Sequence, residues 1–252
     1  DQAGLQASVD CANILPVRKV KIAKLQAKDP SELLMTGRGD KIVNAIFEAK
    51  SYTPQGIIKG SDTKDLLLKD EYVESVPYIW NGLNKKLQGL RVGELTLLCA
   101  GSGTGKSLVC RELATDIINK GHNVAYIALE ESVKRSIRGL VSIVLNAPIH
   151  NSEVRKKIPQ KDIIDAWSKI KDKIFFYDHW GSQDADDLIN RIRYMVSALD
   201  CKYVFLDHIS IVISGQETND ERRLIDMTMT KLRKLVEELK IAMVVVSHLK
   251  RP

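Results

Sequence analysis

Five short, unbroken runs of apolar residues recur in the later two thirds of the chain. They are LTLLC (95–99), VAYIAL (124–129), IFFY (174–177), YVFL (203–206) and AMVVV (242–246). Apolar runs without alternation are typical of parallel strands that helices cover on both faces. Segments with helical spacing separate the runs, and this alternation predicts a mostly parallel sheet with right-handed crossovers. We therefore expect an α/β domain over residues 77–252.

Three of the intervening segments carry clear helix signals. Residues 107–120 have one apolar face and are followed by Gly121, a residue type that favours helix ends. Residues 184–199 begin with aspartates that can cap a helix. The longest segment, residues 219–240, turns five residues to one face, namely Leu224, Thr228, Leu232, Leu235 and Leu239.

The first 76 residues have a weaker pattern. Helical spacing covers residues 2–15 and 39–50, and an alternating stretch at 18–25 suits a strand. Between them we expect a polar loop over KDPSELLMTGRGD (28–40), since it contains proline and glycine. Residues 1–50 are too short for an independent core. Residues 51–76 indicate a linker with a short helix, whose exposed leucines would need a partner surface.

Composition adds few constraints. The 252 residues are 44% hydrophobic and 28% charged, as in an ordinary globular protein. The net charge of +6 is spread along the chain, so it permits a polyanionic partner without requiring one. The four cysteines form no C-x-x-C pair, so we expect free thiols and a reducing compartment. No apolar run approaches the length of a membrane span, and we expect no membrane partner.

The strongest chemical signal is CAGSGTGKS, which joins the first apolar run to the next helix. It fits the phosphate-binding pattern G-x-x-x-x-G-K-[ST] except at Ala100, which stands at the first position. Glycines let backbone N–H groups curl around phosphate oxygens, and the helix adds its positive end. In such a loop Lys106 would reach the β- and γ-phosphates and Ser107 would ligate magnesium. The predicted nucleotide-binding residues are Gly101, Ser102, Gly103, Thr104, Gly105, Lys106, Ser107 and Leu108.

Two other strand ends carry acids. KYVFLDHIS places Asp207 at the carboxyl edge of the sheet, where it would hold magnesium through water, although many buried strands end in aspartate. VAYIALEES ends in Glu130 and Glu131. One carboxylate there could orient and deprotonate an attacking water, or both could serve only to cap the next helix. Because neighbours on a strand point opposite ways, spacing leaves open which glutamate faces the site.

The last apolar run, AMVVVSHLKRP, delivers His248 to the same edge. A histidine there could contact the γ-phosphate and report its loss, or it could be a surface residue satisfied by water. His122, His150 and His179 have spacings that suit no metal site. The three tryptophans are too scattered to predict a platform for bases.

Together these segments resemble the helicase half of the bifunctional primase-helicases of tailed phages. The mitochondrial helicase Twinkle and the bacterial DnaB helicases are more distant relatives. The similarity runs almost continuously over residues 78–252, and LDHIS followed by DERRLID and SHLK is specific, since general RecA-type recombinases lack that set. It implies a RecA-like P-loop fold with its last strands and arginine finger beyond Pro252. The matching segments are GLNKKLQGLRVGELTLLCAGSGTGKS, ALEES, FLDHISIVIS, DERRLIDMTMTKLRKL and VVVSHLK.

The resemblance implies a role for each matching residue. Glu130, the first of its pair, matches the catalytic base, and Asp207 matches the acid on the magnesium side. His248 matches a γ-phosphate sensor that links hydrolysis to a DNA-binding loop. Lys250 and Arg251 begin that loop and would contact phosphates of single-stranded DNA.

It also implies an assembly and a cellular role. The expected protein is a homohexameric ring that uses ATP or dTTP with Mg²⁺ to move 5′–3′ along single-stranded DNA and separate strands. The helix near Leu66–Leu68 would pack on the neighbouring subunit, and the loop SGQETNDERR would face the pore. DNA polymerase and other replisome proteins are candidate partners. The expected location is the cytoplasm of a bacterial host, or else an organelle.

The amino end resembles the last part of a Toprim primase domain. DQAG looks like the end of the motif Asp-x-Asp-x-x-Gly, and KDPSELL resembles a later segment. Asp1 alone cannot build the magnesium site of that motif, so we expect no primase activity. The abrupt start and end suggest a piece of a larger protein.

Two other functions stay open on the sequence. One is a RecA-type recombinase or another filament-forming ATPase, against which SHLK and DERRLID argue. The other is a nucleotide-binding module of the replisome that performs no motor function.

Overall fold

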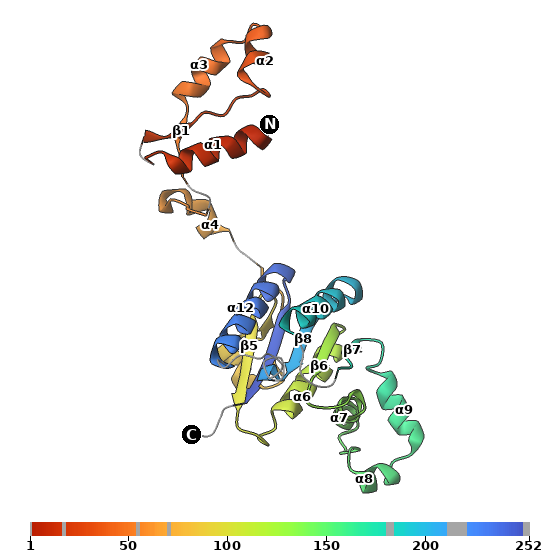
Figure 1. The fold of residues 1–252 in the computed structure, drawn as a ribbon. Coiled ribbons are helices and arrows are strands. Elements are labelled where there is room, and N and C mark those ends of the chain that lie inside the picture. The colour runs from red at the N-terminus through yellow and green to blue at the C-terminus, as the bar shows by residue number, and fades with distance from the viewer. Residues whose placement is uncertain are drawn as a thin grey trace. The chain divides into compact units, whose positions relative to one another are not determined.

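The computed structural model describes residues 2–16, 19–53, 56–69, 72–179, 184–210 and 221–248. They belong to two compact units, Asp1–Glu71 and Tyr72–Pro252 (Figure 1). No helix within these ranges is long and apolar enough to cross a bilayer. The four cysteines are free.

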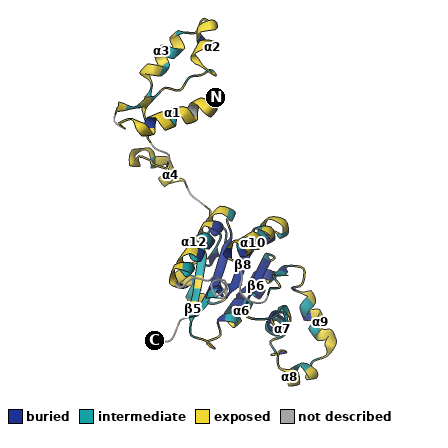
Figure 2. Ribbon diagram, viewed as in Figure 1, coloured by how far each residue is buried: buried dark blue, intermediate teal, exposed yellow. Residues whose placement is uncertain are grey.

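The first unit contains short helices and a two-stranded sheet. Strands β1 (Lys21–Ile22) and β2 (Lys50–Ser51) pair antiparallel. Among the described side chains of this unit, Ala12 and Leu33 are the buried apolar ones, so its core is small (Figure 2). The helical elements are α1 (Gln2–Ile14), α2 (Pro30–Met35), α3 (Asp40–Phe47), a 3₁₀ turn (Gly60–Asp62) and α4 (Lys64–Leu68).

Helix α2 shows that the prediction of a polar loop over residues 28–40 is wrong. The Asp29 carboxylate accepts the backbone N–H of Glu32 at 2.9 Å, and Pro30 occupies the first turn. In return the Glu32 carboxylate accepts the backbone N–H of Lys28 at 3.0 Å. This reciprocal capping, together with a proline whose φ suits a first turn, starts the helix.

The second unit is built on a five-stranded parallel sheet, which confirms the α/β prediction. The strand order is β5-β9-β8-β6-β7, and every pairing is parallel. The central strands are buried on both faces (Figure 2). Their bounds are β5 (Leu95–Ala100), β6 (Asn123–Ala128), β7 (Ile174–Phe176), β8 (Cys201–Asp207) and β9 (Ala242–His248).

Helices cover both faces of this sheet and form two cores (Figure 1). On one face pack α6 (Lys106–Asn119), α7 (Val133–Leu145) and α9 (Gln160–Ser168). On the other pack α10 (Ala185–Leu199) and α12 (Glu221–Leu239). Side chains alternate between the cores along each strand, with Tyr126 in the first and Ile127 in the second. The remaining helices are α5 (Asn81–Leu87) and α8 (Ser152–Lys157).

The predicted helix signals are confirmed. Asp184 caps α10 by accepting the backbone N–H groups of Asp186 and Asp187. Helix α6 ends just before Gly121, which has a φ of +95°. In α12 the predicted inward positions are buried or half-buried.

The parallel arrangement decides where the chemistry lies. The carboxyl ends of parallel strands emerge at one edge of a sheet. The loop after β5, the residues after β6 and the ends of β8 and β9 therefore meet there. This edge carries the phosphate-loop sequence, both candidate glutamates, Asp207 and His248.

An antiparallel pair, β3 (Ser75–Val76) with β4 (Leu90–Arg91), precedes the sheet and depends on Gly89. Gly89 has a φ of +95°, and a Cβ built on it would lie 2.5 Å from Ser75 Oγ and 2.7 Å from the Val76 carbonyl oxygen. We expect Gly89→Ala to lower the free energy of unfolding by about 1–3 kcal/mol, because it adds backbone strain and a steric clash. Urea unfolding followed by circular dichroism measures this loss.

Gly82 supplies the matched control. It lies inside α5, and a Cβ there would meet nothing within 4 Å. Gly82→Ala should therefore be neutral or stabilise by about 0.5–1 kcal/mol. Equal stability of Gly89→Ala and wild type would contradict the strain assigned to this turn.

Candidate functional site

The loop between β5 and α6 has the backbone of a phosphate cradle. Gly103 and Gly105 have φ values of +75° and +93°, and a Cβ at either would meet nothing within 4 Å. Conformation rather than space therefore requires glycine at both positions. The Thr104 hydroxyl donates to the Gly101 carbonyl at 2.9 Å and closes the turn. Ala100 is the last residue of β5 and is not among the residues of positive φ, so its side chain causes no strain.

Lys106 is buried at the base of this loop, with 6% of its surface exposed. Its Nζ donates to the carbonyl oxygens of Ala100 at 3.0 Å and Gly101 at 2.7 Å. The same Nζ lies 3.1 Å from Nδ1 of His248. The structure thus brings together two predicted site residues that are far apart in the sequence.

Ser107 and Asp207 form the predicted pair on the magnesium side. Burial raises the pKa of the Asp207 carboxyl above its ordinary value, and a hydrogen bond with the Ser107 side chain opposes that rise. Hydroxyl and carboxylate oxygens are ligands that Mg²⁺ prefers, so the two residues fit this ion. Such an ion would neutralise charge on the phosphate oxygens of a bound nucleotide.

The structure distinguishes the two glutamates. Glu131 accepts two hydrogen bonds from the Arg111 guanidinium, at 2.7 and 2.6 Å, and one from the Ser136 hydroxyl at 2.7 Å. Both partners of this ion pair are nearly buried, with side chains 16% and 11% exposed. Glu131 is therefore held in a structural ion pair between α6 and the start of α7.

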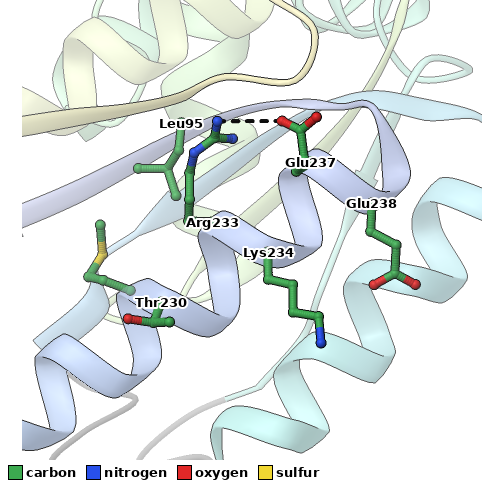
Figure 3. A pocket seen from close by; sticks show the side chains of 7 residues that line it. Leu95, Thr230, Arg233, Lys234, Glu237 and Glu238 are labelled. Atoms are coloured by element: carbon green, nitrogen blue, oxygen red, sulfur yellow. Dashed lines mark hydrogen bonds and ion pairs between the residues drawn. The ribbon is translucent and has the colours of Figure 1, made fainter. Parts of the chain in front are cut away.

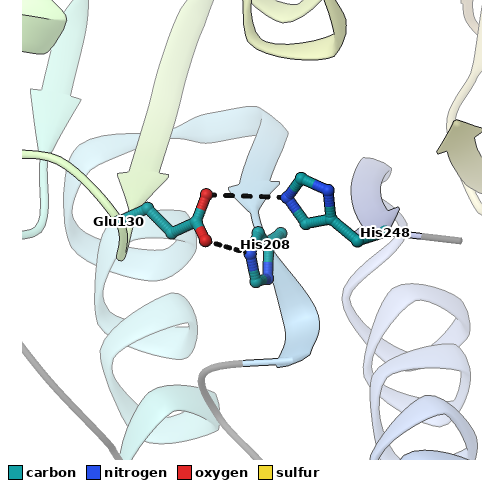
Figure 4. A group of neighbouring side chains, drawn as sticks. All are labelled: Glu130, His208 and His248. Carbon is teal, nitrogen blue, oxygen red and sulfur yellow. Dashed lines mark hydrogen bonds and ion pairs between the residues drawn. The ribbon is translucent and has the colours of Figure 1, made fainter. Parts of the chain in front are cut away.

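Glu130 lies instead with two histidines (Figure 4). One oxygen of its carboxylate is hydrogen-bonded to Nε2 of His208. The other lies 3.6 Å from Nε2 of His248. The Glu130 side chain is 51% exposed, so solvent can reach it. Of the two acids, Glu130 is thus the one beside His248 and Lys106.

Sequence reasoning missed His208, Arg111 and Ser136. His208 follows Asp207 directly, and its ring packs edge-on against His248 with centroids 4.2 Å apart. Its place beside a strand-end acid was the available signal. Arg111 lies 20 residues before its partner Glu131, and nothing in local spacing points to that pair.

Other predicted residues lie apart or outside the described ranges. Ser102 and Leu108 are exposed at the loop and at the start of α6. Lys250, Arg251, Asp1 and most of the predicted pore loop (residues 214–220 of SGQETNDERR) lie outside the described residues. Among described side chains, the grouping with metal-ligand proximity is Glu130 with the two histidines, which leaves out His122, His150 and His179.

A separate hollow of about 890 Å³ opens beside α12 (Figure 3). Charged residues on α12 line much of it, and Arg233 donates to Glu237 at 3.4 Å within it. Of the residues that the structure describes, none from the phosphate loop lines this hollow. The convergent polar groups at the sheet edge therefore make the better candidate site.

Comparison with known proteins places the chain among helicases. Residues 75–252 match the family described as the DnaB-like helicase C-terminal domain. Over its whole length the chain is 33% identical to a DNA helicase/primase of Enterobacteria phage T3, of which it covers 46%. It also covers 41% of a probable plasmid replicative DNA helicase of Chlamydia psittaci, at 22% identity over 73% of the chain. The chain thus spans less than half the length of these two curated relatives.

Solved structures support the same fold. A DnaB-like replicative helicase described with its primase interactions superposes with a TM-score of 0.62 at 16% identity, covering 98% of this chain and 56% of that one. A second solved structure, an isolated ATPase domain, also gives 0.62 at 16% identity, covering 90% and 73%. The RecA-like fold prediction is confirmed. Because the family match extends over well more than half of the sequence, the chain belongs to the family of DnaB-like helicase C-terminal domains.

Proposed function

We propose that this chain is the motor part of a replicative DNA helicase. Hydrolysis of ATP or dTTP drives 5′–3′ movement along single-stranded DNA and separates the duplex. One observation carries the proposal: Lys106, Glu130 and His248 come from three distant segments and meet at one sheet edge. Membership in a helicase family favours this function over a filament-forming recombinase or a passive module.

The site residues suit attack of water on a terminal phosphoryl group. Glu130 accepts a proton as the water oxygen forms its bond to the γ-phosphorus. The bond from that phosphorus to the oxygen bridging the β-phosphate breaks, which releases nucleoside diphosphate and phosphate. Lys106 and the loop N–H groups offset the charge that develops on the phosphate oxygens. Ser107 and Asp207 would hold the magnesium ion.

His248 is positioned to couple this reaction to DNA. It ends β9 and lies 3.1 Å from the Lys106 ammonium on one side and 3.6 Å from Glu130 on the other. A change at the γ-phosphate would therefore reach the segment that follows β9. We propose that Lys250 and Arg251 in that segment contact phosphates of single-stranded DNA.

The working assembly is proposed to be a homohexameric ring. The α4 leucines Leu66, Leu67 and Leu68 are 61%, 82% and 70% exposed, so this short helix presents an apolar surface. We propose that it packs on the neighbouring subunit. The ring would act with DNA polymerase and other replisome proteins, in the cytoplasm of a bacterial host. Residues 1–50 would be the remnant of a Toprim primase domain without primase activity.

Lys106→Ala tests the loop assignment. Loss of the buried ammonium should lower turnover by about 10²–10³-fold, because charge on the transferring phosphoryl group is no longer offset. DNA-stimulated phosphate release measures this in whichever length of the protein gives wild-type turnover. Lys120→Ala, which removes a partly exposed ammonium at the other end of α6, is the control and should keep turnover. Wild-type turnover by Lys106→Ala would refute the phosphate-loop role.

Glu130→Gln and Glu131→Gln form a matched pair. Glu130→Gln should lower turnover by about 10²–10⁴-fold and leave nucleotide affinity intact, since only proton acceptance is removed. Glu131→Gln should keep turnover and lose about 1–3 kcal/mol of stability, because the Arg111 guanidinium loses its charged partner. Fluorescent-nucleotide binding, phosphate release and thermal unfolding separate the two. The reverse pattern would transfer the base to Glu131.

Salt dependence tests the proposed DNA contacts. Affinity for single-stranded DNA should fall steadily on a log–log plot as salt rises from about 50 to 200 mM, because phosphate contacts release counterions. Fluorescence anisotropy with a labelled oligonucleotide measures the slope. The doubly substituted Lys250→Ala, Arg251→Ala protein should show a shallower slope. An affinity independent of salt would contradict backbone contacts.

A further inference from the structure

His208 is a buried side chain without a role in the reaction proposed above. It follows β8 directly and is 5% exposed. Its Nδ1 accepts the backbone N–H of Ser210 at 3.2 Å. A ring nitrogen that accepts a hydrogen bond carries no proton, so the proton of His208 lies on Nε2. That Nε2–H points at Glu130 and donates to its carboxylate (Figure 4).

His248 is in the matching tautomer. Its Nδ1 faces the Lys106 ammonium at 3.1 Å, and an ammonium group only donates. The proton of His248 therefore also lies on Nε2, which is directed at the second oxygen of Glu130 from 3.6 Å. The two oxygens of Glu130 are thus unequal. One is held by a close hydrogen bond, and the other has a long contact only.

We propose that His208 is the positioning residue of Glu130, an inference that rests on the proposed role of Glu130 as base. A half-exposed glutamate has three side-chain torsions to restrict before its oxygen can meet a water at a fixed place. His208 is buried and anchored to its own turn, so its Nε2–H fixes one carboxylate oxygen. The other oxygen is left to accept the proton.

The same three side chains resemble a two-histidine, one-carboxylate metal site, since their ligand atoms lie within 4.8 Å of one another. A metal ion needs an unprotonated nitrogen on each ring. Here both Nε2 atoms hold protons, because the Ser210 N–H and the Lys106 ammonium occupy the two Nδ1 atoms. The neighbouring ammonium would also repel a dication. The contacts therefore favour a hydrogen-bonded cluster.

Three variants of His208 separate its two hydrogen bonds. Glutamine places an amide N–H near the position of Nε2 and keeps the donor to Glu130. Asparagine places an amide oxygen near the position of Nδ1 and keeps the acceptor for Ser210. His208→Ala and His208→Asn should lower kcat by about 10–100-fold with an unchanged KM for nucleotide, because a misplaced base slows chemistry and not binding. His208→Gln should recover most of the loss.

The outcomes decide the proposal cleanly. Recovery by asparagine and not by glutamine would assign His208 to its own turn and overturn it. Wild-type kcat in all three variants would overturn it as well, as would tight Zn²⁺ binding by wild type, followed by calorimetry, that is lost in His208→Ala. If the alanine variant does not fold, the asparagine and glutamine pair still decides. Loss of turnover in Lys106→Ala and Glu130→Gln with no effect at His208 would reject positioning alone and leave the proposed function standing.

Discussion

The parallel pairing of β5 with β9 is the constraint on which the candidate site depends. In this register Ala100 lies opposite His248, and Cys99 lies opposite Ser247. The phosphate loop begins at one of these strand ends and the histidine lies at the other, so the contact between Lys106 and His248 follows from backbone pairing. A slip of one residue would turn His248 to the other face of the sheet. The ladder between two strands thus fixes a distance within the site.

A second constraint ties the site to the helices beneath it. Arg111 on α6 binds Glu131 just before α7, and it does so across Gly139, where a Cβ would lie 2.5 Å from Arg111 Nε. The absence of a side chain at Gly139 lets the guanidinium lie against α7. One of two adjacent glutamates is therefore committed to packing, and its neighbour is directed to the histidines.

Much of the fold followed from the sequence, because burial on two faces leaves an unbroken apolar signal. All five strands and the helices α6, α10 and α12 were predicted from such runs and from capping residues. Helix α2 was missed because glycines beyond its end were given more weight than the Asp29 and Glu32 capping pair. The predicted site residues at the sheet edge converge because they end parallel strands. The choice between Glu130 and Glu131 was beyond local spacing, since it depends on Arg111 and His208, which are close only after folding.

The environment of Lys106 also limits which cation can stand there. Its ammonium meets three acceptors, two loop carbonyls and one imidazole nitrogen, arranged around a single point. A tetrahedral group can direct three protons outward from one atom, whereas a planar guanidinium spreads its donors across a rigid fork. An arginine of equal charge would miss this arrangement and would crowd the turn around it. Shape, as well as charge, selects lysine at the base of the loop.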